Sequence, residues 1–234
     1  KAISLEKNYP QAYAKRGEIH FILKNYELSL KDYSRCIKLN PNLDYVYGLY
    51  VHTKMYLNEW VDFDTHLEKI KDGIKKNKKI INPFISLSLI DDPEMHFKIA
   101  KKFSENILIS NNYKRENRNA DDKIKIGYFS ADFNKHAVSR LIYKMLCFHN
   151  KKKFKIYSYA YGFDKEDDLH NLIKKEVDVY RDIRDIGDHD VALLAKKDNL
   201  DIAIDLQGYT DKSRLSIFAN KVAPIQINYL GYPG

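Results

Sequence analysis

Cysteine, long apolar runs and catalytic signature motifs are scarce or missing in this sequence of 234 residues, and each absence excludes a class of protein. The two cysteines, Cys36 and Cys147, have none of the closely spaced Cys or His neighbours that a zinc site requires. We therefore predict two buried thiols in a reducing compartment.

No stretch of about 18 apolar residues occurs, so neither a membrane-spanning helix nor a membrane partner is expected. The first residues, KAISLEKNYP, lack the apolar segment of a secretory signal, which makes the cytoplasm the expected location. The sequence also starts without Met and in the middle of a pattern. We therefore expect it to be a piece of a longer chain.

Signature motifs of common enzyme classes are missing as well. The sequence has no Walker loop and no G-x-G-x-x-G, so the usual mononucleotide and dinucleotide fingerprints are absent. It has no G-x-S-x-G elbow and no H-E-x-x-H helix either, which gives the common hydrolase and metalloprotease classes no support.

The charge is basic, with 40 Lys and Arg against 32 Asp and Glu, a net charge of +8 and a pI of about 9.1. Such a balance raises the question of nucleic acid. The lysines, however, are scattered or form short runs such as KKNKK (75–79) and KKK (151–153), where helix ends and loops are expected. We interpret them as a solvated surface and predict no nucleic-acid partner. At 44% hydrophobic residues, the chain can bury a core.

The first half contains a helical repeat. AISLEK, beginning at Ala2, is similar to CIKLNP, beginning at Cys36, and this offset is the tetratricopeptide period. With Pro10 as position one, the repeat's aromatic, small, bulky and proline positions are matched by Tyr13, Gly17, His20, Ser29, Tyr33, Cys36 and Pro41. Small residues let two antiparallel helices approach closely, aromatics fill the space beside them, and proline ends the second helix.

The next repeat is weaker, because Tyr47 and Phe63 keep the register while Val51 and Leu67 replace a glycine and an aromatic. A further helix is expected over about 93–108. The repeats suit either a peptide-binding surface or a plain spacer, and for so short an array we favour the spacer. We predict repeats over 1–78 and a helical connector and linker over 79–122, which includes the polar segment SNNYKRENRNADD (110–122).

The second half, 123–234, alternates strands and helices. KIKIGYFS, FKIYSYAY, LDIAIDLQ and PIQINYLG are rich in β-branched and aromatic residues, and helical patterns lie around 138–149, 165–177, 190–197 and 213–219. This alternation predicts a Rossmann-like parallel sheet with helices on both faces. The fold class is therefore α-helical repeats followed by an α/β lobe.

Polar or glycine-bearing turns follow three of the predicted strands directly. They contain Asp132, the run Gln207–Gly208–Tyr209 and the run Gly231–Tyr232–Pro233–Gly234. Because ligands bind beyond the carboxyl ends of parallel strands, the three turns are expected to meet at one edge of the sheet. From the residues alone, Asp132 and His136 fit a helix cap and a surface histidine as well as a site, and the glycines fit simple turns.

Four segments together resemble the O-linked N-acetylglucosamine transferase family (glycosyltransferase family 41), and its bacterial SPINDLY-like members in particular. They are KIGYFSADFNKHAVSRLI, FKIYSYAYGFDKEDDLHNLI, LDIAIDLQGYTDKSRLSIFA and APIQINYLGYPG. The resemblance runs from about residue 82 to the last residue and implies a GT-B glycosyltransferase with two Rossmann-like lobes. This chain would hold the repeats and the first lobe only.

The resemblance also implies an activity. Such enzymes transfer a sugar from a UDP-sugar to a Ser or Thr hydroxyl with inversion, without a catalytic metal or cofactor. The UDP-sugar, a co-substrate, would be bound mainly by the missing second lobe, so the fragment alone would be inactive. A protein or peptide acceptor would bind through the repeats and the cleft.

The residue roles follow from the same resemblance. Asp132 matches a base or proton-relay residue, and His136 matches a histidine beside acceptor and sugar. The substrate-binding residues would be Gly208, Tyr209, Leu230, Gly231, Tyr232 and Pro233. Asp205 fits a buried hydrogen-bond hub as well as a ligand.

The connector INPFISL has no histidine where animal-type relatives have one, and His170 stands where many relatives have arginine. The donor sugar therefore stays open between GlcNAc, fucose, glucose and others. Two alternatives also stay open. One is a tetratricopeptide adaptor with a non-catalytic lobe, and the other is a related transferase acting on asparagine or on a glycan.

Overall fold

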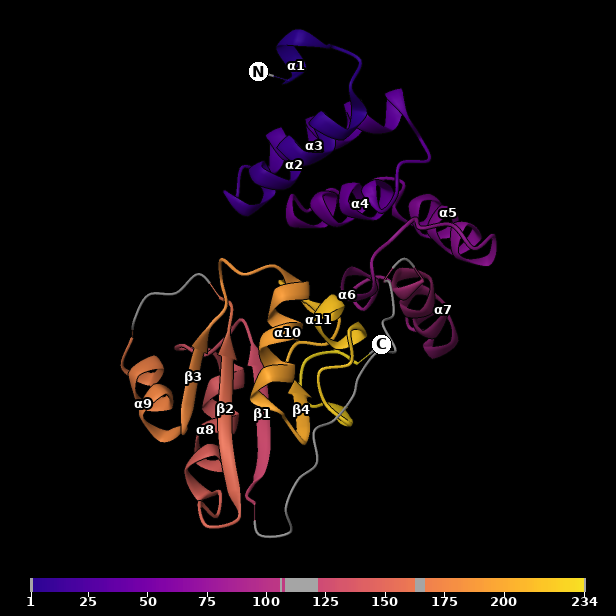
Figure 1. Ribbon diagram of the computed structural model, residues 1–234. Coiled ribbons are helices and arrows are strands. Elements are labelled where there is room, and N and C mark those ends of the chain that lie inside the picture. The colour runs from indigo at the N-terminus through magenta and orange to yellow at the C-terminus, as the bar shows by residue number, and fades with distance from the viewer. Residues whose placement is uncertain (1, 106, 108–121, 163–166, 234) are drawn as a thin grey trace. The chain divides into compact units, whose positions relative to one another are not determined.

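The computed structural model describes residues 2–105, 107, 122–162 and 167–233 (Figure 1). By its internal contacts the chain divides into two compact units, Lys1–Asn106 and Ile107–Pro233. None of the helices in the described ranges has both the length and the apolar character needed to cross a membrane. The predicted linker lies, up to residue 121, outside the described residues, and the three-part domain division stays a prediction.

The first unit is entirely helical. Its helices are α1 (Ala2–Leu5), α2 (Pro10–Ile22), α3 (Tyr26–Leu39), α4 (Val46–Tyr56), α5 (Phe63–Lys75), α6 (Pro83–Ser86) and α7 (Pro93–Ser104). α2 and α3 form the helix pair of the predicted tetratricopeptide repeat, and α2 begins at Pro10, where the missing proline N–H costs no hydrogen bond.

The α2–α3 pair packs as the small residues predict. Gly17 is buried, and a β-carbon at this position would stand 2.9 Å from the ring of Tyr33, which is itself fully buried. The hydroxyl of Ser29 donates to the carbonyl of Gly17 over 2.8 Å and joins the two helices. Cys36 is buried as predicted, but the prediction for Cys147 is wrong, because this residue of the second unit is only half-buried.

The second unit is a five-stranded parallel sheet in the order β3-β2-β1-β4-β5. The strands are β1 (Ile124–Ser130), β2 (Phe154–Ala160), β3 (Val179–Asp182), β4 (Ile202–Asp205) and β5 (Ile225–Asn228). The Rossmann-like prediction is confirmed, although the sequence reading missed β3. That strand lies at the edge of the sheet and has four residues, none of them buried, so it lacks the apolar run that marks the inner strands β1, β2 and β4.

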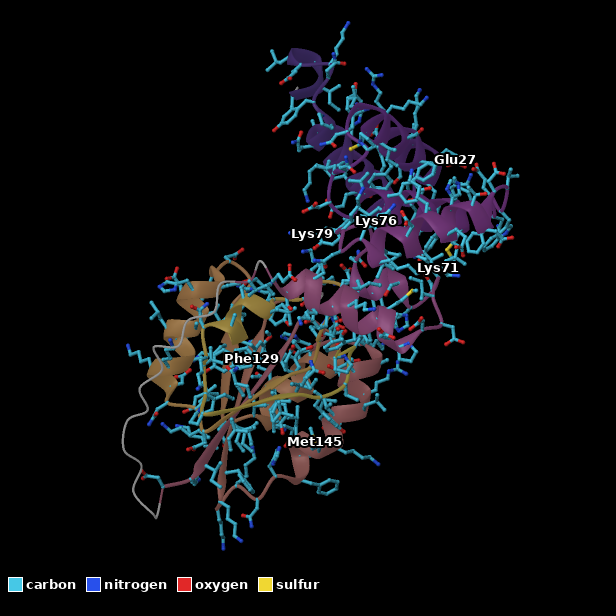
Figure 2. The ribbon with its side chains drawn as sticks, turned by 90° about the vertical axis from the view of Figure 1, so that its right-hand side faces the viewer. Glu27, Lys71, Lys76, Lys79, Phe129 and Met145 are labelled. Carbon is cyan, nitrogen blue, oxygen red and sulfur yellow. The ribbon has the colours of Figure 1, made fainter. Side chains whose placement is uncertain are left out.

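Helices cover both faces of this sheet. α8 (Ala137–Phe148) and α9 (Asp168–Glu176) pack on one face, and α10 (Asp188–Asp198) and α11 (Leu215–Ala219) pack on the other (Figure 1). Phe129 lies in the interior and stacks on Tyr159, with 4.2 Å between the ring centroids (Figure 2). Met145 of α8 packs, partly buried, against the core on the opposite face of the sheet. The ends of β1, β4 and β5 position the turns described next.

Candidate active site

The turns after β1, β4 and β5 meet at one edge of the sheet. The three strands are neighbours and parallel, with Phe129 in register with Asp205 and Asp205 in register with Asn228. The segments that contain Asp132, Gly208 and Gly231 therefore leave the sheet side by side. This is the convergence that the sequence predicts.

Two buried side chains connect the first turn to the second. The backbone N–H of Asp132 donates to Ser130 Oγ over 2.9 Å, and Ser130 Oγ donates to Gln207 Oε1 over 3.2 Å. The amide of Gln207 then donates to the carbonyl of Asp211 over 3.1 Å. Ser130 and Gln207 are 0% and 3% exposed, so water does not compete for these bonds.

The second and third turns are joined through their backbones. Tyr209 N–H donates to Tyr232 O over 2.7 Å, and Tyr232 N–H donates to Gln207 O over 3.4 Å. Gly208 and Gly231 have φ of +58° and +63°, and a β-carbon on either would stand 2.2 Å from a carbonyl oxygen of the opposite turn. Both glycines are thus required by the close approach of the two turns.

The other residues predicted to bind substrate lie in the same two turns. Tyr209 and Tyr232 are half-buried, with ring centroids 6.3 Å apart. Leu230 has a left-handed φ of 64° and packs against the core on the α8–α9 face, while Pro233 is exposed. Gly234 lies outside the described residues.

Asp205 is the hub of this edge. Its carboxylate accepts from the backbone N–H groups of Gln207 (2.9 Å) and Gly208 (3.1 Å) and from the side-chain amide of Asn228 (3.3 Å). Burial raises the pKa of this carboxyl above its ordinary value, although the two backbone donors act in the opposite direction. Of the two interpretations that the sequence leaves open, the structure shows the hydrogen-bond hub.

Asp132 and His136 lie close together in the first turn. His136 Nδ1 and Asp132 Oδ2 are 3.6 Å apart, and their side chains are 49% and 13% exposed. The cap of α8 is His136 and not Asp132, because His136 Nδ1 accepts from the backbone N–H of Val138 over 3.3 Å. While Nδ1 accepts this bond, the neutral ring carries its proton on Nε2.

The Asp132 backbone is also held from α8, since Ser139 Oγ donates to its carbonyl. Ser130, Ser139 and the bonds made by Gln207 were not identified from the sequence, because a serine that stabilises a turn looks like any other serine in a chain. Among residues 2–105, 122–162 and 167–233, no three His, Cys, Asp or Glu side chains gather as a metal site would require.

The sequence profile of glycosyl transferase family 41 matches residues 58–234, which include the whole described sheet and all three turns. The chain belongs to glycosyl transferase family 41. A tetratricopeptide profile matches residues 10–43, the α2–α3 pair. Both matches agree with the resemblance found in the sequence.

Family 41 relatives with curated names include plant and animal proteins. The chain is 25% identical over 203 residues to a probable UDP-N-acetylglucosamine–peptide N-acetylglucosaminyltransferase SEC of Arabidopsis thaliana, which covers 79% of this chain and 21% of the relative. It is 36% identical over 118 residues to a probable transferase SPINDLY of Hordeum vulgare, covering 49% of this chain and 12% of the relative.

A solved family structure confirms the fold. The O-GlcNAc transferase of Thermobaculum terrenum, in a mutant form, superposes with a TM-score of 0.68 at 20% identity over 98% of this chain and 45% of that chain. The family 41 chain described here thus spans about a fifth or less of the curated relatives named above.

Proposed function

We propose that the protein containing this chain is an inverting glycosyltransferase that transfers a sugar, GlcNAc foremost, from a UDP-sugar to a Ser or Thr hydroxyl. The observation that carries the proposal is the family 41 match over 58–234, which ends on the turn after β5. The three joined turns at the carboxyl edge support it, because ligands of parallel sheets bind there.

Asp132 is the proposed proton acceptor, directly or through a relay. In an inverting transfer the hydroxyl oxygen bonds to the anomeric carbon, the bond from that carbon to the UDP oxygen breaks, and its electron pair leaves with UDP. The hydroxyl proton must pass to a base, and a carboxylate that is 13% exposed at a strand end is accessible for this. His136, half-exposed beside it, would position the acceptor.

The remaining roles concern binding. Gly208, Tyr209, Leu230, Gly231, Tyr232 and Pro233 would contact the transferred sugar and the acceptor from the two joined turns. A protein or peptide acceptor would bind through the cleft and the repeats of the first unit, which is the alternative to the plain spacer that the length of the array favours. UDP would be held mainly by a second lobe outside this chain, with no metal and no cofactor.

The test is a screen of UDP- and GDP-sugars for hydrolysis or transfer by the full-length protein. We expect turnover of a UDP-sugar, with UDP-GlcNAc as the first candidate. If transfer occurs only to asparagine or to a glycan, the proposed Ser or Thr acceptor is wrong. If no nucleotide sugar is bound or turned over, the lobe is a non-catalytic scaffold and the proposal is wrong.

A further inference from the structure

The turn between β1 and α8 depends on α9 for two of its backbone hydrogen bonds. Within the turn, Asn134 N–H donates to Asp132 O over 2.7 Å and His136 N–H donates to Asn134 O over 2.6 Å. The N–H of Lys135 and the carbonyl of Phe133 instead bond to side chains at the start of α9. Backbone polar groups need such partners, so α9 completes the turn.

Asp167 bonds to both segments through one carboxylate. Its Oδ1 accepts from the N–H of His170 over 2.9 Å and caps α9, while its Oδ2 accepts from the N–H of Lys135 over 2.6 Å. The His170 and Lys135 N–H groups lower the pKa of this carboxyl. A helix cap needs one acceptor oxygen. The bond from the second oxygen to a distant turn is therefore additional to capping.

His170 makes the second connection from inside the protein. It is 6% exposed, and its Nδ1 donates to the carbonyl of Phe133 over 3.0 Å. The ring packs edge-on against Tyr180 of β3, with centroids 5.4 Å apart. Because a carbonyl oxygen can only accept, His170 carries a proton on Nδ1 in this bond.

We propose that Asp167 and His170 are positioning residues that fix the turn bearing Asp132 and His136 in its productive geometry. The inference rests on the function proposed for that turn. Neither side chain needs to touch a substrate. A displacement of about 1 Å of a reacting group can lower the rate about 100-fold. The loss of either connection should therefore lower turnover strongly while the protein stays folded.

Three variants separate positioning from capping and packing. Asp167→Asn keeps a residue that caps helices well but leaves one acceptor oxygen for two N–H donors, so the Lys135 bond is lost. His170→Phe keeps a ring against Tyr180 without a donor, and His170→Asn restores a donor near the Nδ1 position. The matched control is Asp92→Asn, because Asp92 caps α7 in the other unit by accepting from Met95 N–H over 3.0 Å.

The first measurement is amide hydrogen exchange in the full-length protein, which does not depend on activity. Exchange of residues 133–136 should rise at least about 5-fold in Asp167→Asn and His170→Phe, as expected for one lost hydrogen bond. His170→Asn should recover most of the protection, and Asp92→Asn should leave these amides unchanged. Unchanged exchange in the first two variants would overturn the proposal.

The second measurement is nucleotide-sugar turnover by the full-length protein. Asp167→Asn and His170→Phe should lower kcat by about 100-fold while KM for the nucleotide sugar stays within about 2-fold, and His170→Asn should recover much of kcat. An active wild type whose variants keep kcat would overturn the positioning role alone. A wild type that turns over no nucleotide sugar would overturn the proposed function, and the positioning role with it.

Discussion

At the scale of single residues, Asp132 combines a fixed backbone with a partly free carboxylate. Its N–H and C=O are held by Ser130 and Ser139, while its Oδ2 stands 3.6 Å from His136 Nδ1, too far for a hydrogen bond. The backbone atoms of Asp132 therefore stabilise the turn, while its carboxylate is available for catalysis. A substitution of the side chain should change activity and leave stability nearly unchanged.

The substitution Asp132→Asn should lower sugar transfer by the full-length protein at least about 100-fold, because an amide cannot accept the proton that a general base takes. The free energy of unfolding should change by less than about 1 kcal/mol, since the backbone bonds persist. Turnover assays and urea unfolding measure the two effects. The exposed Asp190→Asn on α10 is the control, and retention of more than a fifth of the activity in Asp132→Asn would contradict the assignment.

The contribution of Asp205 to folding stability should fall as pH rises, whereas that of most carboxylates increases with pH. Because burial raises its folded-state pKa, the native protein holds this proton more tightly than the unfolded chain. Its contribution to stability is full below the unfolded pKa of about 3.9 and falls as pH rises through the folded pKa.

The non-titrating variant Asp205→Asn provides the comparison. The stability advantage of the wild type over this variant should narrow as pH rises from about 3.5 to about 7. Urea unfolding of both proteins at several pH values measures this difference. An advantage that widens with pH would show that the Gln207 and Gly208 donors dominate over burial.

At the scale of elements, the turns after β4 and β5 stabilise each other, because backbone hydrogen bonds join them. The substitution Gly208→Ala should destabilise the chain by roughly 2–4 kcal/mol, from a left-handed alanine and a β-carbon 2.2 Å from Tyr232 O. The control Gly187→Ala, with φ of −65° and its nearest neighbouring atom at 3.9 Å, should change stability by less than about 1 kcal/mol.

Far-UV circular dichroism during urea unfolding measures the loss for Gly208→Ala. Fluorescence of the single tryptophan, Trp60, follows the helical unit separately, because Trp60 lies between α4 and α5. If Gly208→Ala and Gly187→Ala were equally stable, the turns would not be packed as described.

The elements also show what sequence reasoning can find. The 34-residue repeat predicted the α2–α3 pair, and runs of β-branched and aromatic residues predicted four of the five strands, including β5, whose residues are exposed. The strand β3 and the second bond of Asp167 depend on neighbours far away in the sequence. A cap is readable from the Asp167 and His170 spacing, whereas the partner Lys135 is not.

At the scale of the whole molecule, the sequence predicts at which edge of the sheet the candidate site lies. Parallel order places the turns after β1, β4 and β5 together once the strands are known, so Asp132, Gly208 and Gly231 could be grouped in advance. The glycines looked like ligand contacts or turns equally well. Only the short backbone distances between the two turns show that both positions require glycine.

The last prediction concerns the chain as a separate protein. It matches 45% of the Thermobaculum structure, and the proposed function assigns most UDP contacts to a second lobe outside this chain. The 234-residue chain should fold, as judged by cooperative unfolding, because each of its units has its own buried core. It should turn over no UDP-sugar under conditions where the full-length protein does. Turnover by the chain at a rate near that of the full-length protein would place the whole site on the edge formed by β1, β4 and β5.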